Sequence, residues 1–379
     1  MGLNAGSGQT GNRVFLAGQS AGKFTTQADL IVIGDNAFAS GTSAAPNSTA
    51  SFAGMICIGS GAGAVASTAS TTGGANGLTG SILIGLNAAT AAVDCGSNII
   101  VGSNAAASVV GLVNSNPFYA NVIIGSEAVA QLSPASGTFR TLTNNVVIGK
   151  RACYGSLAHA DSALTTSVIL GADSCLNSFA QVSNGGNITS SVVIGYQAAQ
   201  SLASAGAFTT QNNVIIGSNC IQSTASNITD NTLVGFGILA DAGTFDSNVI
   251  VGSSSRTGSL NNTFIGTACS PSVTPGSRNI LIGNQAGSSL GAGYNDTFAL
   301  ETKVGATRRT LLAGDLNLGN LIVGNSNPAT DRTTSGTNTL KLLNGTSTGA
   351  VTGGGFFYVN AGALHWVGSA GTDTTVAPA

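Results

Sequence analysis

The side chains that could carry out chemistry are few and scattered along this chain of 379 residues. There are 14 acidic residues, and no close pairing of them recurs. Enzymes that cut glycans need two carboxylates facing each other across the scissile bond. Asp29 and Asp35 flank one apolar segment, and we interpret them as the solvated ends of a strand. Glu127 and Glu301 are far apart in sequence. We therefore predict that the protein is not an enzyme.

The remaining polar motifs also have simpler explanations than catalysis. His159-Ala160-Asp161 could be a fragment of a metal or base site, but the chain has only 2 histidines, so we interpret it as a loop. The pair Arg308-Arg309 could contact an acidic glycan, although a solvated turn explains it better. No Gly-x-Ser-x-Gly motif or phosphate-binding loop occurs. We predict no cofactor and no metal.

The 6 cysteines have no metal-binding spacing. None forms a Cys-x-x-Cys pair, which zinc sites commonly use. Small apolar positions suit free thiols, so we predict reduced, buried cysteines in a protein made in the cytoplasm. They are Cys57, Cys95, Cys153, Cys175, Cys220 and Cys269.

The composition limits the elements that can position these residues. Only 7% of the residues are charged, against about 25% in typical globular proteins. The apolar runs are far shorter than the roughly 20 residues of a membrane-spanning helix, so we expect no membrane insertion. Apolar residues nevertheless recur regularly, which argues against disorder. The net charge of -2 provides no basic surface for nucleic acid.

A short repeat dominates the chain. NIIVGSNA from Asn98, NVIIGSEA from Asn121 and NVVIGKRA from Asn145 share one pattern. It is Asn or Ser, three apolar residues, Gly, two variable residues and a small residue. Variable insertions between constant units are typical of solenoids. The repeat glycines, to which we assign a structural role, are Gly34, Gly59, Gly85, Gly102, Gly125, Gly149, Gly171, Gly195, Gly217, Gly235, Gly252, Gly266 and Gly283.

Each position of the repeat predicts a structural role. The Gly is expected to adopt a positive φ or to allow close backbone approach. The small residue three positions later predicts a tight interior corner. The opening Asn residues could form a hydrogen-bonded ladder.

The apolar residues of the repeat predict a strand that is buried on both faces, because side chains alternate along a strand. We expect one face to lie inside the coil. We expect the residues in the middle of each apolar triplet, Val32 through Leu281, to form a second apolar stripe on the other face. Identical chains would cover such a stripe, which predicts a homotrimer.

The repeat resembles two families. One is the trimeric head domain of trimeric autotransporter adhesins. The other is the group of bacteriophage tail-fibre and receptor-binding proteins with the same kind of repeat. The segment NDTFALETKVGATRRTLLAGDL from Asn295 looks like the closing segment of such phage fibres. Neither a signal peptide nor a C-terminal membrane barrel is recognised, which favours the phage resemblance. It implies an all-β fold with a parallel β-solenoid or β-roll shaft, intertwined or packed as a homotrimer, and a small β C-terminal region.

Aromatic residues are the best candidates for receptor binding, because aromatic faces are common binding surfaces. Near the C-terminus these are Phe356, Phe357, Tyr358, His365 and Trp366. The core of a small tip would explain the same cluster. Phe118-Tyr119 is a second, loop-borne candidate.

The predicted organisation is an entry segment over residues 1–30, a shaft of thirteen rungs over 31–290, and a closing and C-terminal tip or attachment region over 291–379. The resemblance implies a virion fibre, made in the bacterial cytoplasm, that attaches to the host surface. Its expected partners are other copies of the chain, other tail or capsid proteins and a host glycan or protein. A glycan-cutting spike and a purely structural appendage remain alternatives.

Overall fold

The computed structural model describes most of the repeat units and parts of the C-terminal region. The described residues are 2–7, 12–23, 29–39, 53–64, 79–90, 95–107, 118–130, 141–154, 163–175, 186–199, 208–221, 227–240, 244–257, 260–270, 276–288, 290, 293–304, 307–317, 320–323, 340–342, 356–360, 362–367 and 373–377. Over these residues the protein is all-β, without a helix, as predicted. Two compact units are present, Met1–Asn248 and Val249–Ala379.

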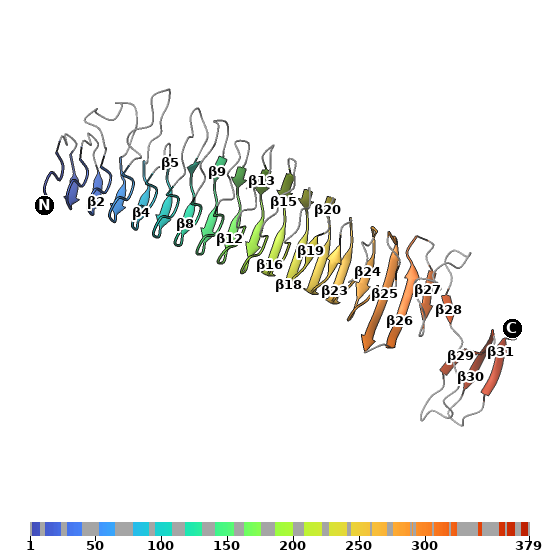
Figure 1. Ribbon diagram of the computed structural model, residues 1–379. Helices are drawn as coiled ribbons and strands as arrows, with labels where there is room; N and C mark the ends of the chain where they lie inside the picture. Colours follow the sequence, from blue (N-terminus) through green and yellow to red (C-terminus); the bar gives the residue numbers. More distant parts are fainter. Residues whose placement is uncertain are drawn as a thin grey trace. The chain divides into compact units, whose positions relative to one another are not determined.

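The first unit contains two parallel sheets (Figure 1). Each repeat contributes one short strand to the first sheet, in register with the strands of the repeats before and after it. These strands are β1 (Val14–Ala17), β2 (Leu30–Ile33), β3 (Ile56–Ile58), β4 (Ile82–Ile84), β6 (Ile99–Val101), β8 (Val122–Ile124), β10 (Val146–Ile148), β12 (Val168–Leu170), β14 (Val192–Ile194), β16 (Val214–Ser218) and β18 (Thr232–Phe236).

The second sheet of this unit is formed by the segments that lead into the repeats. Its strands are β5 (Cys95–Gly96), β7 (Phe118–Tyr119), β9 (Thr141–Thr143), β11 (Ala163–Thr165), β13 (Gly186–Thr189), β15 (Phe208–Gln211), β17 (Asn227–Thr229) and β20 (Thr244–Asp246). The unit also includes the short β19 (Leu239–Ala240). Successive parallel strands with one strand per repeat are consistent with the predicted solenoid. We call one repeat strand with its following corner a rung.

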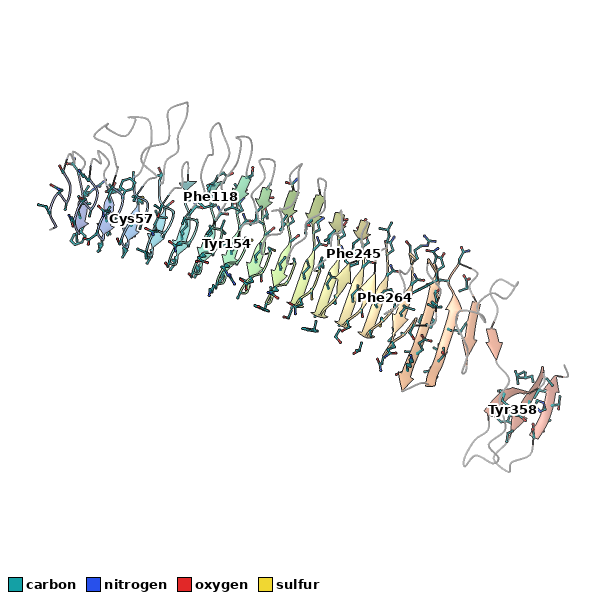
Figure 2. All side chains as sticks on the ribbon, viewed as in Figure 1. Cys57, Phe118, Tyr154, Phe245, Phe264 and Tyr358 are labelled. Carbon is teal, nitrogen blue, oxygen red and sulfur yellow. The ribbon has the colours of Figure 1, made fainter. Side chains whose placement is uncertain are left out.

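The prediction of which strand face is exposed was wrong. In every repeat the middle residue of the apolar triplet is completely buried, from Val32 to Leu281. Its neighbours point outward: Ile31 and Ile33 are exposed while Val32 is not. The middle residues thus form a column in the core of the coil, together with buried corner residues and buried residues of the second sheet. Both faces of the strand are apolar in the sequence. Alternation alone therefore does not determine which face becomes the inside of the coil. Cys57, Phe118 and Phe245, labelled in Figure 2, belong to this buried core.

The repeat glycine has both of the properties predicted for it. Gly125 has a φ of +143°, a conformation that residues with side chains rarely adopt. A Cβ atom there would lie 2.2 Å from the carbonyl oxygen of Gly149 in the following rung. Since this contact is with backbone, no side-chain rearrangement can relieve it. The glycines are therefore what lets neighbouring corners stack at the spacing of a β-sheet.

The predicted asparagine ladder is present and buried. Asn121 donates a side-chain hydrogen bond to Asn98 Oδ1 at 3.0 Å, and Asn145 does the same to Asn121 Oδ1 at 3.0 Å. The side-chain nitrogen of Asn121 also donates to the carbonyl of Leu142, in the second sheet. Ser167 continues the stack by donating its N–H to Asn145 Oδ1. The ladder thus fastens the two sheets together and satisfies buried polar groups.

The predicted interior corner is also confirmed. The residue three positions after the repeat glycine is buried whether it is Ala, Ser, Cys or Ile. Positions two and four after the glycine often have positive φ, as at Asn104 and Ala106. Two left-handed residues around a buried one bend the chain sharply toward the second sheet.

The second unit begins with further repeat strands and then changes pattern. β21 (Val249–Ser253), β23 (Thr263–Thr267), β24 (Ile280–Ile282) and β25 (Thr297–Val304) are successively parallel. β25 then forms an antiparallel hairpin with β26 (Thr307–Asp315). The remaining strands of the unit are β22 (Arg256–Thr257), β27 (Asn320–Val323), β28 (Leu340–Leu342), β29 (Phe356–Asn360), β30 (Ala363–Val367) and β31 (Asp373–Ala377).

The change at β25 has a clear cause in the sequence. Ile280, Leu281 and Ile282 pair with Phe298, Ala299 and Leu300, so Glu301 follows where a repeat glycine would stand. Without a glycine the backbone does not make the corner. The strand continues through an irregularity at Leu300 and Glu301 and returns as β26, which closes the stack of repeats in this unit.

Candidate functional site

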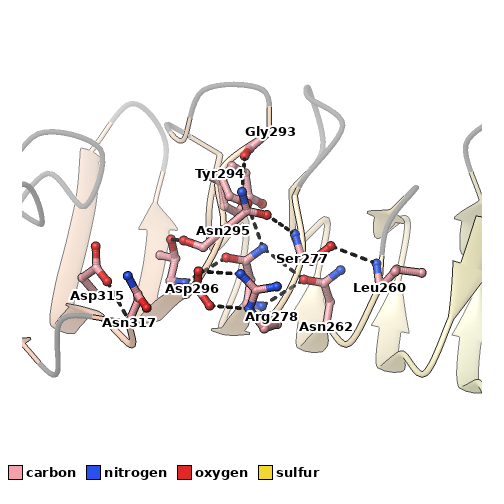
Figure 3. Close-up of polar contacts among 12 residues, drawn as sticks. Leu260, Asn262, Ser277, Arg278, Gly293, Tyr294, Asn295, Asp296, Asp315 and Asn317 are labelled. Atoms are coloured by element: carbon pink, nitrogen blue, oxygen red, sulfur yellow. Dashed lines mark hydrogen bonds and ion pairs between the residues drawn. The ribbon is translucent and has the colours of Figure 1, made fainter.

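The acidic residues singled out in the sequence are engaged in local contacts. Asp29 accepts a 2.7 Å hydrogen bond from Arg13, on the adjacent rung. Asp35 accepts the backbone N–H of Gln19 at 2.8 Å. In the second unit Arg278 and Asp296, which precede the adjacent strands β24 and β25, form a similar ion pair (Figure 3). Exposed ion pairs of this kind contribute little stability, but they reinforce the register of the corners.

Glu301 is the one glutamate that the fold buries. Its two carboxylate oxygens accept hydrogen bonds from the Gly287 N–H at 2.5 Å and from the Thr310 hydroxyl at 3.1 Å. Within the part of the chain that the structure describes, no group of three or more His, Cys, Asp or Glu side chains could hold a metal ion. Glu301 is therefore positioned to stabilise the end of the repeat stack.

The cysteines whose side chains are described are free and buried, as predicted. Burial raises the pKa of the Cys57 thiol to about 12 and that of Cys269 to about 11. A thiol is nucleophilic only as the thiolate, so these groups are unreactive near neutral pH. The side chain of Cys95 lies outside the described residues. Packing accounts for the five others.

The predicted aromatic cluster is brought together on a three-stranded antiparallel sheet made of β29, β30 and β31. Phe357 lies directly opposite Trp366, with ring centroids 4.7 Å apart and the planes tilted by 51°. Phe357 is 57% exposed. The Phe356 side chain lies outside the described residues. This sheet face therefore presents an apolar, aromatic surface.

The opposite face of the same sheet is polar. Tyr358 pairs with His365, with ring centroids 5.0 Å apart. Asp373 on β31 accepts a hydrogen bond from the Tyr358 hydroxyl and lies 2.9 Å from His365 Nδ1. The hydrogen bond to Asp373 raises the pKa of the Tyr358 hydroxyl, and the same bond lowers the pKa of the Asp373 carboxyl. The three side chains form one fixed polar cluster.

Comparison with protein-family models, curated proteins and solved structures found no match. Among the residues described, no helix has the length and apolar character needed to cross a membrane.

The second aromatic candidate was only half right. Phe118 and Tyr119 form strand β7 instead of a loop. Phe118 is fully buried, because it points into the coil, whereas Tyr119 is exposed. His159 and Asp161 lie outside the described residues. Arg308 and Arg309 lie within β26, but their side chains are not among those described.

Two exposed aromatic residues on the first unit were not identified from the sequence. Tyr196 and Phe236 each follow a repeat glycine directly, at a position that elsewhere holds mostly small or polar residues. They are 52% and 55% exposed. The sequence did offer one signal for them. They stand directly after a repeat glycine, at a variable position of the repeat, and the fold places this position on the outside.

Proposed function

We propose that this protein is a homotrimeric virion fibre that attaches a bacteriophage to the surface of its bacterial host. The observation that carries the proposal is the outward face of the repeat strands. Aliphatic residues on this face are between 36% and 40% exposed on several rungs of the first unit. They are Ile31, Ile33, Ile84, Ile99, Ile148 and Ile216.

An apolar stripe of this kind needs a cover in water. The outward aliphatic side chains form two columns, one and three residues before the repeat glycine, and on the rungs between the listed ones they are partly exposed. Such columns are unlike the scattered exposed residues of ordinary monomers. The same face on identical chains is complementary to it at every rung, because the chains share one rung spacing. Three copies are favoured because the repeat resembles those of trimeric fibres.

The attachment role is supported by the aromatic sheet of β29–β31. Aromatic side chains supply much of the binding energy at protein surfaces. Phe357 and Trp366 offer such a surface in each chain, and three chains would multiply it by avidity. The expected partners are a glycan or protein of the host surface and other tail or capsid proteins. The expected location is the virion, after synthesis in the bacterial cytoplasm.

Two measurements test this proposal. Sedimentation analysis at micromolar concentration is expected to give a trimer, and a stable monomer would reject the oligomeric part. Purified trimer is expected to compete with phage for adsorption to host cells. If it does not compete, a structural appendage explains the fibre better. Turnover of purified host polysaccharide by the trimer would instead identify a glycan-cutting spike.

A further inference from the structure

We propose that Tyr196 and Phe236 form a binding site for a linear glycan on the outer surface of the first unit. This inference deepens the proposed function by naming a ligand class on the shaft. It rests on the proposed function for the ligand class, because a virion fibre would contact the glycans of the host surface. The site itself is defined by the register of three rungs.

The two rings lie on rungs that are separated by one other rung. The N–H of Asn219 donates to the Tyr196 carbonyl at 3.1 Å, which places Ser218 beside Tyr196. The Ser218 hydroxyl also donates to that carbonyl, at 3.2 Å. On its other side Ser218 is paired in register with Phe236. The order along the stack is therefore Tyr196, Ser218, Phe236.

The spacing of the rings suits a repeating chain. Adjacent rungs are about 4.8 Å apart, so residues two rungs apart are about 10 Å apart. This is comparable to the length of a disaccharide in an extended glycan. The small Ser218 leaves the space between the rings open. Ala172 is likewise small on the rung before Tyr196, since the Gln197 N–H donates to its carbonyl.

The chemistry of the surroundings matches a sugar. The negative face of an aromatic ring attracts the polarised C–H groups on the flat side of a hexose. Gln197 and Asn219 follow Tyr196 and Ser218 directly, and both are partly exposed. The side-chain amide of Gln197 can both donate to and accept from hydroxyl groups. Rings that alternate with small residues and border amides favour an extended glycan over a compact ligand.

A second copy of the chain is the main competing occupant, and charge argues against it. The position after the repeat glycine carries exposed Asp35 and exposed Lys150 on other rungs. In a trimer with equivalent rungs at equal height, a contact at this position would bring three like charges together. Such contacts are unfavourable. By alternation Ser218 and Phe236 lie on the same outward face as Ile216 and Val234, so we place this column at the edge of the subunit contact and not within it.

The test uses the full-length trimer and an immobilised panel of linear neutral and acidic oligosaccharides, from disaccharides to octasaccharides. Binding is expected to tighten sharply once a glycan is long enough to span both rings. Tyr196→Ala and Phe236→Ala are each expected to weaken binding about tenfold. Leu86→Ala is the matched control, because Leu86 occupies the same repeat position and is 51% exposed, between rungs that carry Ser60 and Ser103. It should bind as the unaltered protein does.

Three results would overturn the inference. The unaltered trimer could bind no member of the panel, or both ring variants could bind like the Leu86→Ala control. Alternatively, sedimentation could show that the ring variants are no longer trimeric, which would place the rings in the subunit contact. The proposed function is judged separately by competition for adsorption. If the trimer competes but binds no glycan, attachment stands and this site does not.

Discussion

The carboxylate of Glu301 accepts a 2.5 Å hydrogen bond from the backbone N–H of Gly287, fourteen residues earlier in the chain. On the preceding rung the equivalent N–H, that of Ser270, donates to the carbonyl of Ala286 in the next corner. Gly287 has no further corner to donate to, because β25 continues as a strand past Glu301. Glu301 therefore replaces a missing rung and caps the repeat stack of the second unit.

Removing this cap should destabilise the second unit. Glu301→Ala leaves the Gly287 N–H and the Thr310 hydroxyl without their acceptor, which we expect to cost about 1–3 kcal/mol. Glu301→Gln keeps an acceptor oxygen, so its loss should be smaller. Urea unfolding measures both changes. Glu127→Ala, at a partly exposed corner, is the control, and an equal loss there would show that the cap is unimportant.

Gly125→Ala should disrupt the stacking of corners. The new Cβ would clash with the Gly149 carbonyl oxygen, and the residue would keep a φ that alanine avoids. Strain in such a conformation alone costs on the order of 1–3 kcal/mol. Gly237→Ala is a matched control, because φ is also positive there but no atom lies within 4 Å of the added Cβ. Thermal unfolding should show a much larger decrease for Gly125→Ala.

Substitutions at two neighbouring residues of β16 should distinguish an effect on folding from an effect on trimer assembly. Ile215 is fully buried inside the coil, whereas Ile216 is 37% exposed on the outward face. Ile215→Asp should prevent folding, because burying an unpaired carboxylate costs several kcal/mol. Ile216→Asp should leave the strand signal in circular dichroism and abolish the trimer in sedimentation. A trimeric Ile216→Asp variant would exclude this stripe from the subunit contact.

The Tyr358–Asp373 contact predicts an acid-sensitive sheet. The hydrogen bond from Tyr358 lowers the pKa of Asp373 in the folded state. Its stabilisation is therefore present above the ordinary Asp pKa of about 3.9 and is lost as pH falls through the lowered folded value. Trp366 is the only tryptophan, so its fluorescence reports on this sheet.

Fluorescence of Trp366 should change as the pH falls below the ordinary Asp pKa of about 3.9 and through the lowered pKa of Asp373. Asp373→Asn should remove most of the pH dependence, whereas Asp246→Asn, in the first unit, should not alter it. An unchanged acid transition in Asp373→Asn would show that another group controls the sheet.

Features that repeat at every rung could be predicted from the sequence. The positive φ and close approach of Gly125, the buried corner at Ala128 and the ladder through Asn121 all follow from local geometry. Each of these three features depends only on one residue and on the residue at the same repeat position of the next rung. The antiparallel pairing of β29 with β30 likewise places Phe357 against Trp366 within a few residues of chain.

Other features were decided only by the tertiary structure. Every repeat strand is apolar on both faces, so only the direction of the coil's turn shows that Val32 is inside and Ile33 outside. Tyr196, Ser218 and Phe236 share one position in consecutive repeats, but only the fold shows that this position faces outward and leaves both rings exposed. The capping role of Glu301 was also decided by the fold, because its carboxylate meets the Gly287 N–H only where β25 continues without a corner. Contacts that recur at every rung are encoded in each repeat. The burial of Val32, the exposure of the two rings and the contact of Glu301 depend on how the folded chain places the repeats.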